Sequence, residues 1–185
     1  MARTVEPRLV TPAKFAHYVL RVSNLDDAIA WYNAVLGMEV VHRNDFICFL
    51  TYDDEHHRMA MVQVSPNADV DKETRLGLPG LDHVAYTLNS LEELLATYKR
   101  LKAHDILPVW PINHGLTTSM YYADPDGNRV EFQVENLETK EELQGFMRSE
   151  AFAQNPIGVD FDPEKLLQRF ENGDPIEELI RQGSA

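Results

Sequence analysis

The stretch HYVLRVSNLDDAIAWY at residues 17–32 returns in altered form as HVAYTLNSLEELLATY at residues 83–98. The two segments align without a gap at a constant offset of 66 residues, from 17 to 83, and each opens with a histidine. Such self-similarity indicates a duplicated supersecondary unit, and two copies favour a closed pair over a solenoid. The repeat therefore predicts a fold built from two related halves.

The first copy predicts a strand, a helix and three further strands. Ser23 or Asn24 can cap the helix, and Gly37 can end it because glycine accepts a left-handed backbone. Apolar residues recur at helical spacing inside the helix, whereas the strands are short apolar runs. The expected elements are a strand at 13–22 that carries His17, a helix at 25–36, and strands at 38–43, 45–52 and 58–64.

The second copy repeats this order after a polar linker at residues 65–81, which contains proline and glycine. Asp124-Pro125-Asp126-Gly127 predicts a tight turn, because proline fixes one dihedral angle and glycine accepts a positive one. The expected elements are a strand at 81–88, a helix at 90–104, and strands at 107–110, 117–123 and 129–135.

The fold class that follows is α+β, with two βαβββ units paired into a curved sheet cup. We expect one module over residues 1–137 and a helical C-terminal extension over residues 138–185. Asp162-Pro163 and Asp174-Pro175 each predict a helix start, with aspartate as N-cap and proline as the first helical residue. The extension is expected to pack on its own module or on a sister subunit.

Composition excludes several classes of partner. The 185 residues carry a formal charge of −13 and a sequence pI near 4.9, whereas nucleic acids and anionic membranes both require a basic face. Cys48 is the single cysteine and lies in an apolar run, so we expect a buried, unpaired thiol and a reducing compartment. Residues 1–4 show no apolar signal core, and we expect a cytoplasmic location.

Three residues form a candidate set of metal ligands. His17 and His83 occupy the same register of the two copies, and Glu131 lies on the last strand of the second. Two neutral imidazoles and one carboxylate are typical of non-haem Fe(II) sites with open coordination positions. Each residue alone has a plainer interpretation, since strand histidines are commonly structural and Glu131 could pair with Arg129. The repetition of the histidine at one register favours metal binding.

Three motif groups resemble a known family. They are the paired histidines His17 and His83, the segment EHHRMAM at 55–61, and a string that runs from NHGLT at 113–117 through Tyr121 to DPDGNRVE at 124–131. Over residues 14–134 the chain resembles the vicinal-oxygen-chelate superfamily, which includes glyoxalases, bleomycin resistance proteins and dioxygenases. Within this superfamily it is most similar to single-module type I extradiol catechol dioxygenases.

The resemblance implies a ring-cleaving dioxygenase of aromatic catabolism that binds Fe(II), with Mn(II) as the alternative metal. It implies His17, His83 and Glu131 as the metal ligands and His57 as the acid–base residue. It also implies that His114 and Tyr121 form hydrogen bonds with the substrate. The partners would be a small aromatic diol, O2 and further copies of the chain in a homo-oligomer.

Two other functions remain open at this level. A glyoxalase-like isomerase or transferase is expected to carry a carboxylate in the first unit, at the place occupied by Ala60 or Met61. A metal-free module that sequesters a small molecule would need none of the six site residues. The residues also leave open whether the diol is catechol, an alkylcatechol or a biphenyl diol. The side chains that could line its pocket, or equally belong to the core, are Phe15, Phe46, Trp110 and Met120.

Overall fold

The computed structural model describes residues 9, 11–65 and 79–185, and the chain divides into two units, Met1–Pro66 and Asn67–Ala185. We call them unit 1 and unit 2 and describe each by itself. The division agrees with the duplication seen in the sequence. The linker expected at residues 65–81 falls mostly on residues 66–78, which lie outside the described residues, as do residues 1–4.

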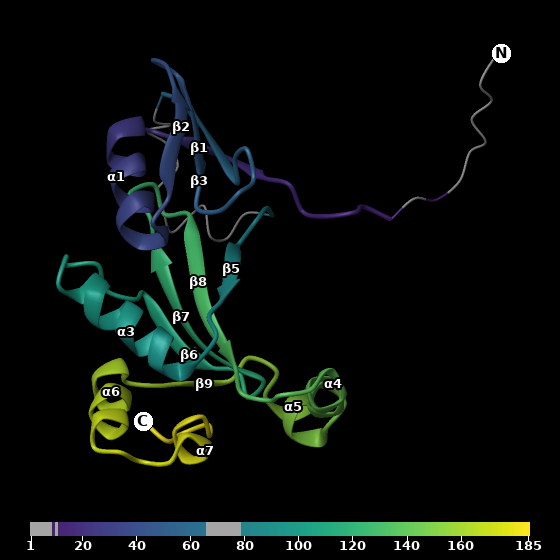
Figure 1. The fold of residues 1–185 in the computed structure, drawn as a ribbon. Coiled ribbons are helices and arrows are strands. Elements are labelled where there is room, and N and C mark those ends of the chain that lie inside the picture. Colours follow the sequence, from purple (N-terminus) through teal and green to yellow (C-terminus); the bar gives the residue numbers. More distant parts are fainter. Residues whose placement is uncertain (1–8, 10, 66–78) are drawn as a thin grey trace. The chain divides into compact units, whose positions relative to one another are not determined.

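Within its described residues, unit 1 contains one helix and a four-stranded sheet (Figure 1). Asn24 caps the helix by accepting hydrogen bonds from two backbone amides, and Gly37 ends it at a φ of 66°, as expected. The sheet has the order β1-β4-β3-β2, with β1 parallel to β4 and the other neighbours antiparallel. Its elements are β1 (Tyr18–Val22), α1 (Leu25–Leu36), β2 (Glu39–Arg43), β3 (Ile47–Thr51) and β4 (Met59–Gln63).

The core of unit 1 lies between α1 and the sheet. The helix buries Leu25, Ala28, Tyr32 and Val35, and Cys48 is fully buried and unpaired, as its apolar surroundings predicted. The first strand is shorter than expected because its pairing with β4 begins at Tyr18. His17 therefore lies directly before β1 rather than within it, and its side chain is exposed.

Unit 2 repeats the architecture and extends it to five strands in the order β5-β8-β7-β6-β9, in which β9 is the short strand Val159–Asp160. The helix begins after Ser90, which accepts a hydrogen bond from the Glu93 amide. Figure 1 shows this helix lying across one face of the sheet. The repeated elements are β5 (His83–Thr87), α3 (Leu91–Lys102), β6 (Trp110–Asn113), β7 (Thr117–Ala123) and β8 (Arg129–Glu135).

The strand expected at residues 107–110 was misplaced, since β6 occupies Trp110–Asn113. Leu107 and Val109 are apolar yet exposed, and Pro108 offers no amide donor for a sheet ladder. Regular pairing with β7 begins only where Trp110 faces Tyr121. The apolar residues at 107–109 therefore precede the strand and do not form part of it.

The turn between β7 and β8 has the predicted chemistry. The Asp124 carboxylate accepts hydrogen bonds from the backbone amides of Asp126 and Asn128 at 2.9 and 2.8 Å, and Gly127 has a φ of 85°. Because this turn fixes where β8 begins, it also fixes the register that places Glu131 opposite Tyr121.

The C-terminal extension contains four helices. It also contains one strand, β9, which the sequence did not predict. Its elements are α4 (Lys140–Met147), α5 (Glu150–Gln154), β9 (Val159–Asp160), α6 (Pro163–Glu171) and α7 (Ile176–Leu179). Asp162 caps α6 with Pro163 as its first residue, as expected. The same expectation for Asp174 was wrong. Its carboxylate lies 2.6 Å from Arg169 Nε instead, and α7 begins after Pro175 without a side-chain cap.

Among the four aromatic and apolar residues that the sequence left between pocket and core, Met120 is fully buried and belongs to the core. Phe15 and Phe46 are 67% and 61% exposed, so neither is a core residue, and Trp110 is half-buried. Within residues 9, 11–65 and 79–185, the structure contains no helix with the length and apolar character needed to span a membrane.

Candidate metal centre

The pairing of β5 with β8 brings His83 and Glu131 together in unit 2. The strands are parallel, with His83 opposite Arg129 and Ala85 opposite Glu131. Nε2 of His83 lies 3.1 Å from Oε2 of Glu131. Glu131 is 4% exposed, whereas His83 is half-buried and is the first residue of β5. A nearly buried carboxylate thus faces an imidazole nitrogen that solvent can still reach.

The second ring nitrogen of His83 faces another carboxylate. Nδ1 lies 2.7 Å from Oδ1 of Asp82, and this contact, followed by that of Arg129, lowers the pKa of Asp82. A carboxylate can only accept, so Nδ1 carries the proton and the lone pair of a neutral ring lies on Nε2. Nε2 and Glu131 are then two acceptors in contact, which a shared proton or a shared cation satisfies. The donor set therefore fits a divalent metal ion.

Arg129 also binds Asp82 and keeps its carboxylate in place beside His83. Its Nη2 lies 2.6 Å from each Asp82 oxygen, and its Cζ lies 5.7 Å from the centroid of Tyr121 and 6.0 Å from that of Trp110. The idea that Glu131 is merely a solvent-facing partner of Arg129 was wrong, because Glu131 is buried and Arg129 pairs with Asp82. Sequence reasoning missed Asp82, although an aspartate directly before a strand-opening histidine was a visible signal.

Two more of the predicted site residues lie beside Glu131. Tyr121 stands opposite Glu131 in the β7–β8 ladder and is 3% exposed. Nε2 of His114 lies 3.1 Å from the Tyr121 hydroxyl and 4.0 Å from Oε1 of Glu131. Burial raises the pKa of Tyr121, and the negative charge of Glu131 raises it further. Tyr121 is therefore a neutral phenol that can donate its proton in a hydrogen bond.

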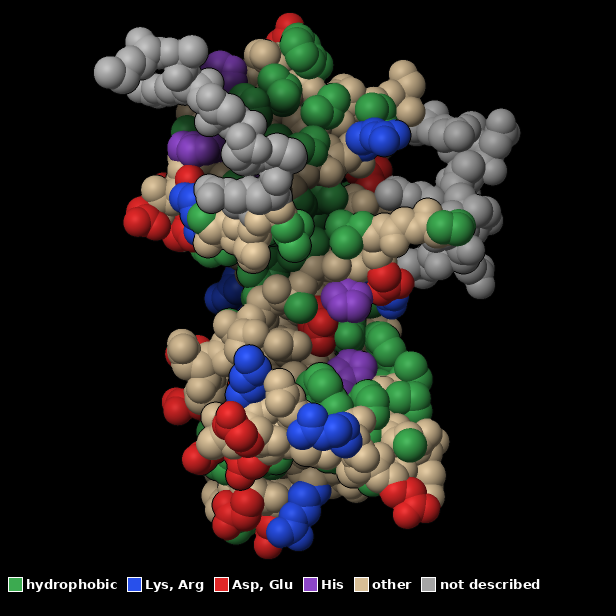
Figure 2. All heavy atoms as spheres, turned by 90° about the vertical axis from the view of Figure 1, so that its right-hand side faces the viewer, with side chains coloured by type: hydrophobic (Ala, Val, Ile, Leu, Met, Phe, Trp, Pro, Cys, Tyr) green, Lys and Arg blue, Asp and Glu red, His purple; other side chains and the backbone are tan. Residues whose placement is uncertain are grey.

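Unit 1 contributes the remaining two predicted residues, His17 and His57. Their ring centroids are 4.3 Å apart, and Nδ1 of His57 lies 2.6 Å from Nδ1 of His56. Burial lowers the pKa of His57, and the charges of His17 and His56 lower it further. Figure 2 shows histidine side chains reaching the surface on the face drawn there, some of them beside acidic groups. His57 is thus a half-buried base packed against His17.

The register of unit 1 identifies the counterpart of Glu131. The parallel pair β1–β4 places Val19 opposite Ala60, just as β5–β8 places Ala85 opposite Glu131. Ala60, and not Met61, therefore occupies the equivalent position, and it is 3% exposed. A methyl side chain offers no ligand atom, so unit 1 has no carboxylate at the place where a glyoxalase-like site is expected to carry one.

The six predicted residues divide between the units. Unit 2 brings together His83, His114, Tyr121 and Glu131, and unit 1 brings together His17 and His57. Across the part of the chain that the structure describes, no three histidine, cysteine, aspartate or glutamate side chains form a ready metal-binding group.

Similarity to known proteins extends over nearly the whole chain. The sequence model of the glyoxalase/bleomycin resistance protein/dioxygenase superfamily matches residues 14–132. Biphenyl-2,3-diol 1,2-dioxygenase 2 of Rhodococcus globerulus is 42% identical over 166 residues, which cover 90% of this chain and 86% of the relative. Biphenyl-2,3-diol 1,2-dioxygenase 3 of the same organism is 41% identical over 182 residues, which cover 98% and 92%. An alignment of 182 residues necessarily includes the C-terminal extension.

More distant similarity reaches other members of the superfamily. A lactoylglutathione lyase of Neisseria meningitidis is 28% identical over 125 residues, which cover 64% of this chain and 88% of the lyase. The crystal structure of a glyoxylase/bleomycin resistance protein/dioxygenase domain from Frankia sp. EAN1pec superposes with a TM-score of 0.55 at 18% identity, covering 71% of this chain and 97% of that chain. This superposition supports the fold assigned from the strands and helices. The chain belongs to the glyoxalase/bleomycin resistance protein/dioxygenase superfamily.

Proposed function

We propose that the protein is an extradiol dioxygenase, which cleaves the ring of a catechol-type diol beside its hydroxyl groups and inserts both atoms of O2. The observation that carries this proposal is the 41–42% identity, over 90–98% of the chain, to two proteins named as biphenyl-2,3-diol 1,2-dioxygenases. The reaction is balanced because the ring-opened product retains every atom of the diol and of O2.

His17, His83 and Glu131 are the proposed metal ligands, with Fe(II) as the metal and Mn(II) as the alternative. The contact between His83 Nε2 and Glu131 Oε2 supports this assignment, because two facing acceptors require a proton or a cation between them. Asp82 supports it further, since it fixes the tautomer of His83 that leaves Nε2 free to bind a metal. His17 enters the set as the counterpart of His83 in the duplicated sequence.

A divalent metal held by these three residues would supply a Lewis acid for the diol and O2. Glu131 contributes negative charge from a buried position, which favours a cation in this part of unit 2. Tyr121 keeps its phenolic proton and can donate it in a hydrogen bond to an oxygen of the substrate. His114, which contacts the Tyr121 hydroxyl, limits the directions in which that hydroxyl can point.

His57 is the proposed acid–base residue. Its lowered pKa leaves the ring neutral near pH 7, so it can accept a proton from a substrate hydroxyl. Nδ1 faces His56, and we therefore expect Nε2 to be the atom that exchanges the proton. The same nitrogen can return the proton to the product, because a catalyst must end each cycle in its starting state.

The structure argues against the glyoxalase-like alternative at one point. Ala60 occupies the place of a possible first-unit carboxylate, so a metal bound here would lack that ligand. A metal-free sequestering module would have no use for the acceptor pair His83 and Glu131. Metal content and oxygen consumption distinguish both alternatives from the proposed enzyme.

The test is an aerobic panel of catechol, alkylcatechols and biphenyl diols, added to protein that has been purified without oxygen and loaded with Fe(II). We expect a yellow ring-opened product, and 18O2 should place both labelled atoms in it. His83→Ala should abolish metal binding and product, whereas His104→Ala, an exposed histidine elsewhere in unit 2, should retain both. A fully loaded protein that leaves the whole panel unchanged would contradict the proposal.

A further inference from the structure

The C-terminal extension lies beyond residues 14–132, which match the superfamily, yet it pairs directly with the strand that leads to His114. β9 adds to the edge of β6, with Val159 opposite Asn113 and Asp160 opposite Ile112. Trp110 also donates its indole N–H to Oδ1 of Asp160 at 2.9 Å. Figure 1 shows β9 running along the edge of the unit 2 sheet. The extension is therefore part of the sheet that carries the candidate site.

We propose that this extension positions His114 through the backbone carbonyl of Ile157 and holds its ring as the tautomer with the proton on Nδ1. Nδ1 of His114 is hydrogen-bonded to that carbonyl oxygen, and Nε2 faces the hydroxyl of Tyr121 at 3.1 Å. A carbonyl can only accept, so Nδ1 must donate, and Nε2 of the neutral ring then carries a lone pair. The Tyr121 hydroxyl, which is also hydrogen-bonded to Glu131, can donate to this lone pair. The catalytic part of the proposal rests on the proposed dioxygenase function.

The Ile157 carbonyl is held in place by its neighbours. Asn155 forms a clamp across the loop, because its Nδ2 donates to the Gly158 carbonyl at 2.7 Å and its Oδ1 accepts from the Gly158 amide at 3.0 Å. Gly158 has a φ of 118°, and a Cβ there would lie 2.3 Å from the Asn113 carbonyl oxygen and 2.8 Å from Cα of His114. The loop can approach His114 this closely only because residue 158 has no side chain.

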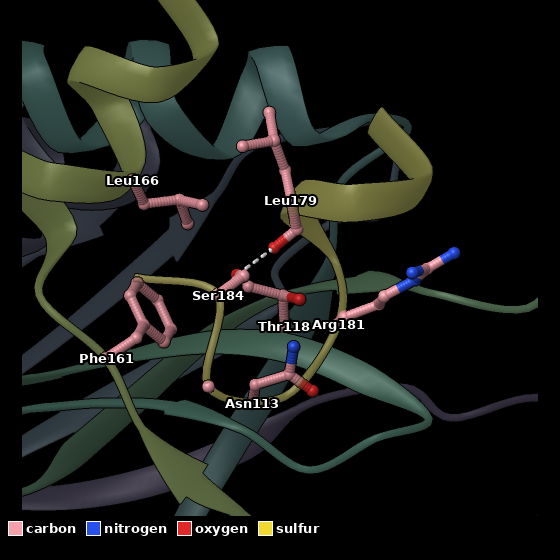
Figure 3. A pocket seen from close by; sticks show the side chains of 8 residues that line it. Asn113, Thr118, Phe161, Leu166, Leu179, Arg181 and Ser184 are labelled. Atoms are coloured by element: carbon pink, nitrogen blue, oxygen red, sulfur yellow. Dashed lines mark hydrogen bonds between the residues drawn. The ribbon is translucent and has the colours of Figure 1, made fainter. Parts of the chain in front are cut away.

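The end of the chain fastens the same segment from another side. Asn113 is 3% exposed, donates to the Ile180 carbonyl at 2.8 Å and accepts a hydrogen bond from Gln182 at 3.0 Å. Figure 3 shows Asn113 and Thr118 of the sheet among side chains of the extension, namely Phe161, Leu166, Leu179, Arg181 and Ser184. His114 thus follows a residue whose side chain and backbone are both tied to the C-terminus. These contacts give the extension a role in the site in addition to its role in packing.

The test compares Gly158→Ala with a matched control, Gly173→Ala. Both glycines lie in the extension at positive φ, but a Cβ at residue 173 would meet open space. Alanine at 158 should push the loop away from His114, whereas alanine at 173 strains the backbone without touching the site. Asn155→Ala is a milder second variant, because it removes the clamp from an exposed position and leaves the core intact.

The first readout is the 15N spectrum of histidine-labelled, metal-free full-length protein at a pH where imidazole is neutral, with His114→Gln to assign the signals. We expect wild type and Gly173→Ala to show His114 protonated on Nδ1, and Gly158→Ala and Asn155→Ala to shift toward the Nε2 form. The second readout is turnover of the catechol that wild type cleaves fastest. Gly158→Ala should lower kcat about 10- to 100-fold, with a smaller change in KM.

Three results would overturn the positioning role. The first is a wild-type His114 protonated on Nε2, and the second is a folded Gly158→Ala protein that keeps both the wild-type tautomer and the wild-type kcat. Equal losses of kcat in Gly158→Ala and Gly173→Ala would also overturn it, because general destabilisation would then explain both. A wild type that cleaves no catechol would overturn the proposed function instead. The spectra would still support or overturn the role of the extension.

Discussion

Nδ1 of His83 lies 2.7 Å from Oδ1 of Asp82, so the acidic residue directly before β5 determines how the histidine presents its other nitrogen. Metal-binding histidines are commonly oriented in this way, with the free ring N–H donated to a carboxylate. Arg129 binds the same carboxylate through both of its oxygens and keeps it in position. The contact therefore links a surface ion pair to the geometry of the candidate metal centre.

Asp82→Asn should weaken metal binding about 10- to 100-fold, because the amide orients His83 less strongly and adds no negative charge. The measurement is a competition titration of Mn(II) or Fe(II) against a chelator under anaerobic conditions. Asp105→Asn is the control, since it makes the same chemical change at an exposed position of unit 2. Equal affinities for wild type and Asp82→Asn would show that Asp82 does not support the metal.

Glu131→Gln should abolish the thermal stabilisation that a metal gives to the wild type. A ligand at about a hundredfold above its Kd stabilises a protein by about 2.7 kcal/mol, which corresponds to a rise in Tm of about 5–10 °C for a protein of this size. The metal-free variant should fold, because it replaces a nearly buried charge with a neutral group of similar shape. Scanning calorimetry with and without Mn(II) measures both effects, and a variant that still gained stability from Mn(II) would exclude Glu131 as a ligand.

Tyr121→Phe should lower kcat about 5- to 30-fold, the value of one lost hydrogen bond of about 1–2 kcal/mol. The remaining ring keeps its packing against Trp110 and His83, whose centroids lie 4.9 and 5.0 Å from that of Tyr121. The matched control is Tyr122→Phe, since the next residue of β7 is also buried but its hydroxyl contacts Met120 Sδ at 3.7 Å. Steady-state kinetics compare the two variants. Equal kcat values would show that the Tyr121 hydroxyl does not contribute to the reaction.

Local signals predicted those parts of the fold that depend on a few neighbouring residues. Asn24 and Gly37 bound α1 as expected, and Asp124 and Gly127 form the expected turn, because caps and turns depend on side-chain oxygens and positive φ values within a few residues. The start of β6 depends instead on which residue meets Tyr121 of a later strand. Apolar composition alone could not identify that residue.

From the sequence, the residues of the candidate site could be predicted only where the side chain, and not the backbone, takes part in the chemistry. His83, Glu131, His114 and Tyr121 belong to residue types with a recognisable function, and unit 2 does bring them together. The carbonyl of Ile157 has no such signal, since every residue carries one and only the pairing of β9 with β6 brings this one to His114. The sequence also did not predict β9, because a strand of two residues is too short to show a strand pattern.

Gly115→Ala should destabilise unit 2 more than Gly173→Ala does, although the two glycines have nearly equal φ values of 87° and 85°. A left-handed backbone costs alanine about 1–2 kcal/mol at either position. At residue 115 a Cβ would in addition lie 2.3 Å from Cζ of Phe146, which belongs to α4. Denaturant unfolding should therefore give a loss for Gly115→Ala about 1–3 kcal/mol larger than that of the control.

A double variant separates the two causes. In Gly115→Ala combined with Phe146→Ala, the steric conflict is absent and only the backbone strain remains, so the effects of the single variants should not add. Gly115→Ala should lower the free energy of unfolding less in the Phe146→Ala background than in the wild type, because the clash is then absent. Strict additivity would show that α4 moves freely away from residue 115, and the packing of this helix would then have no influence on the segment that carries His114.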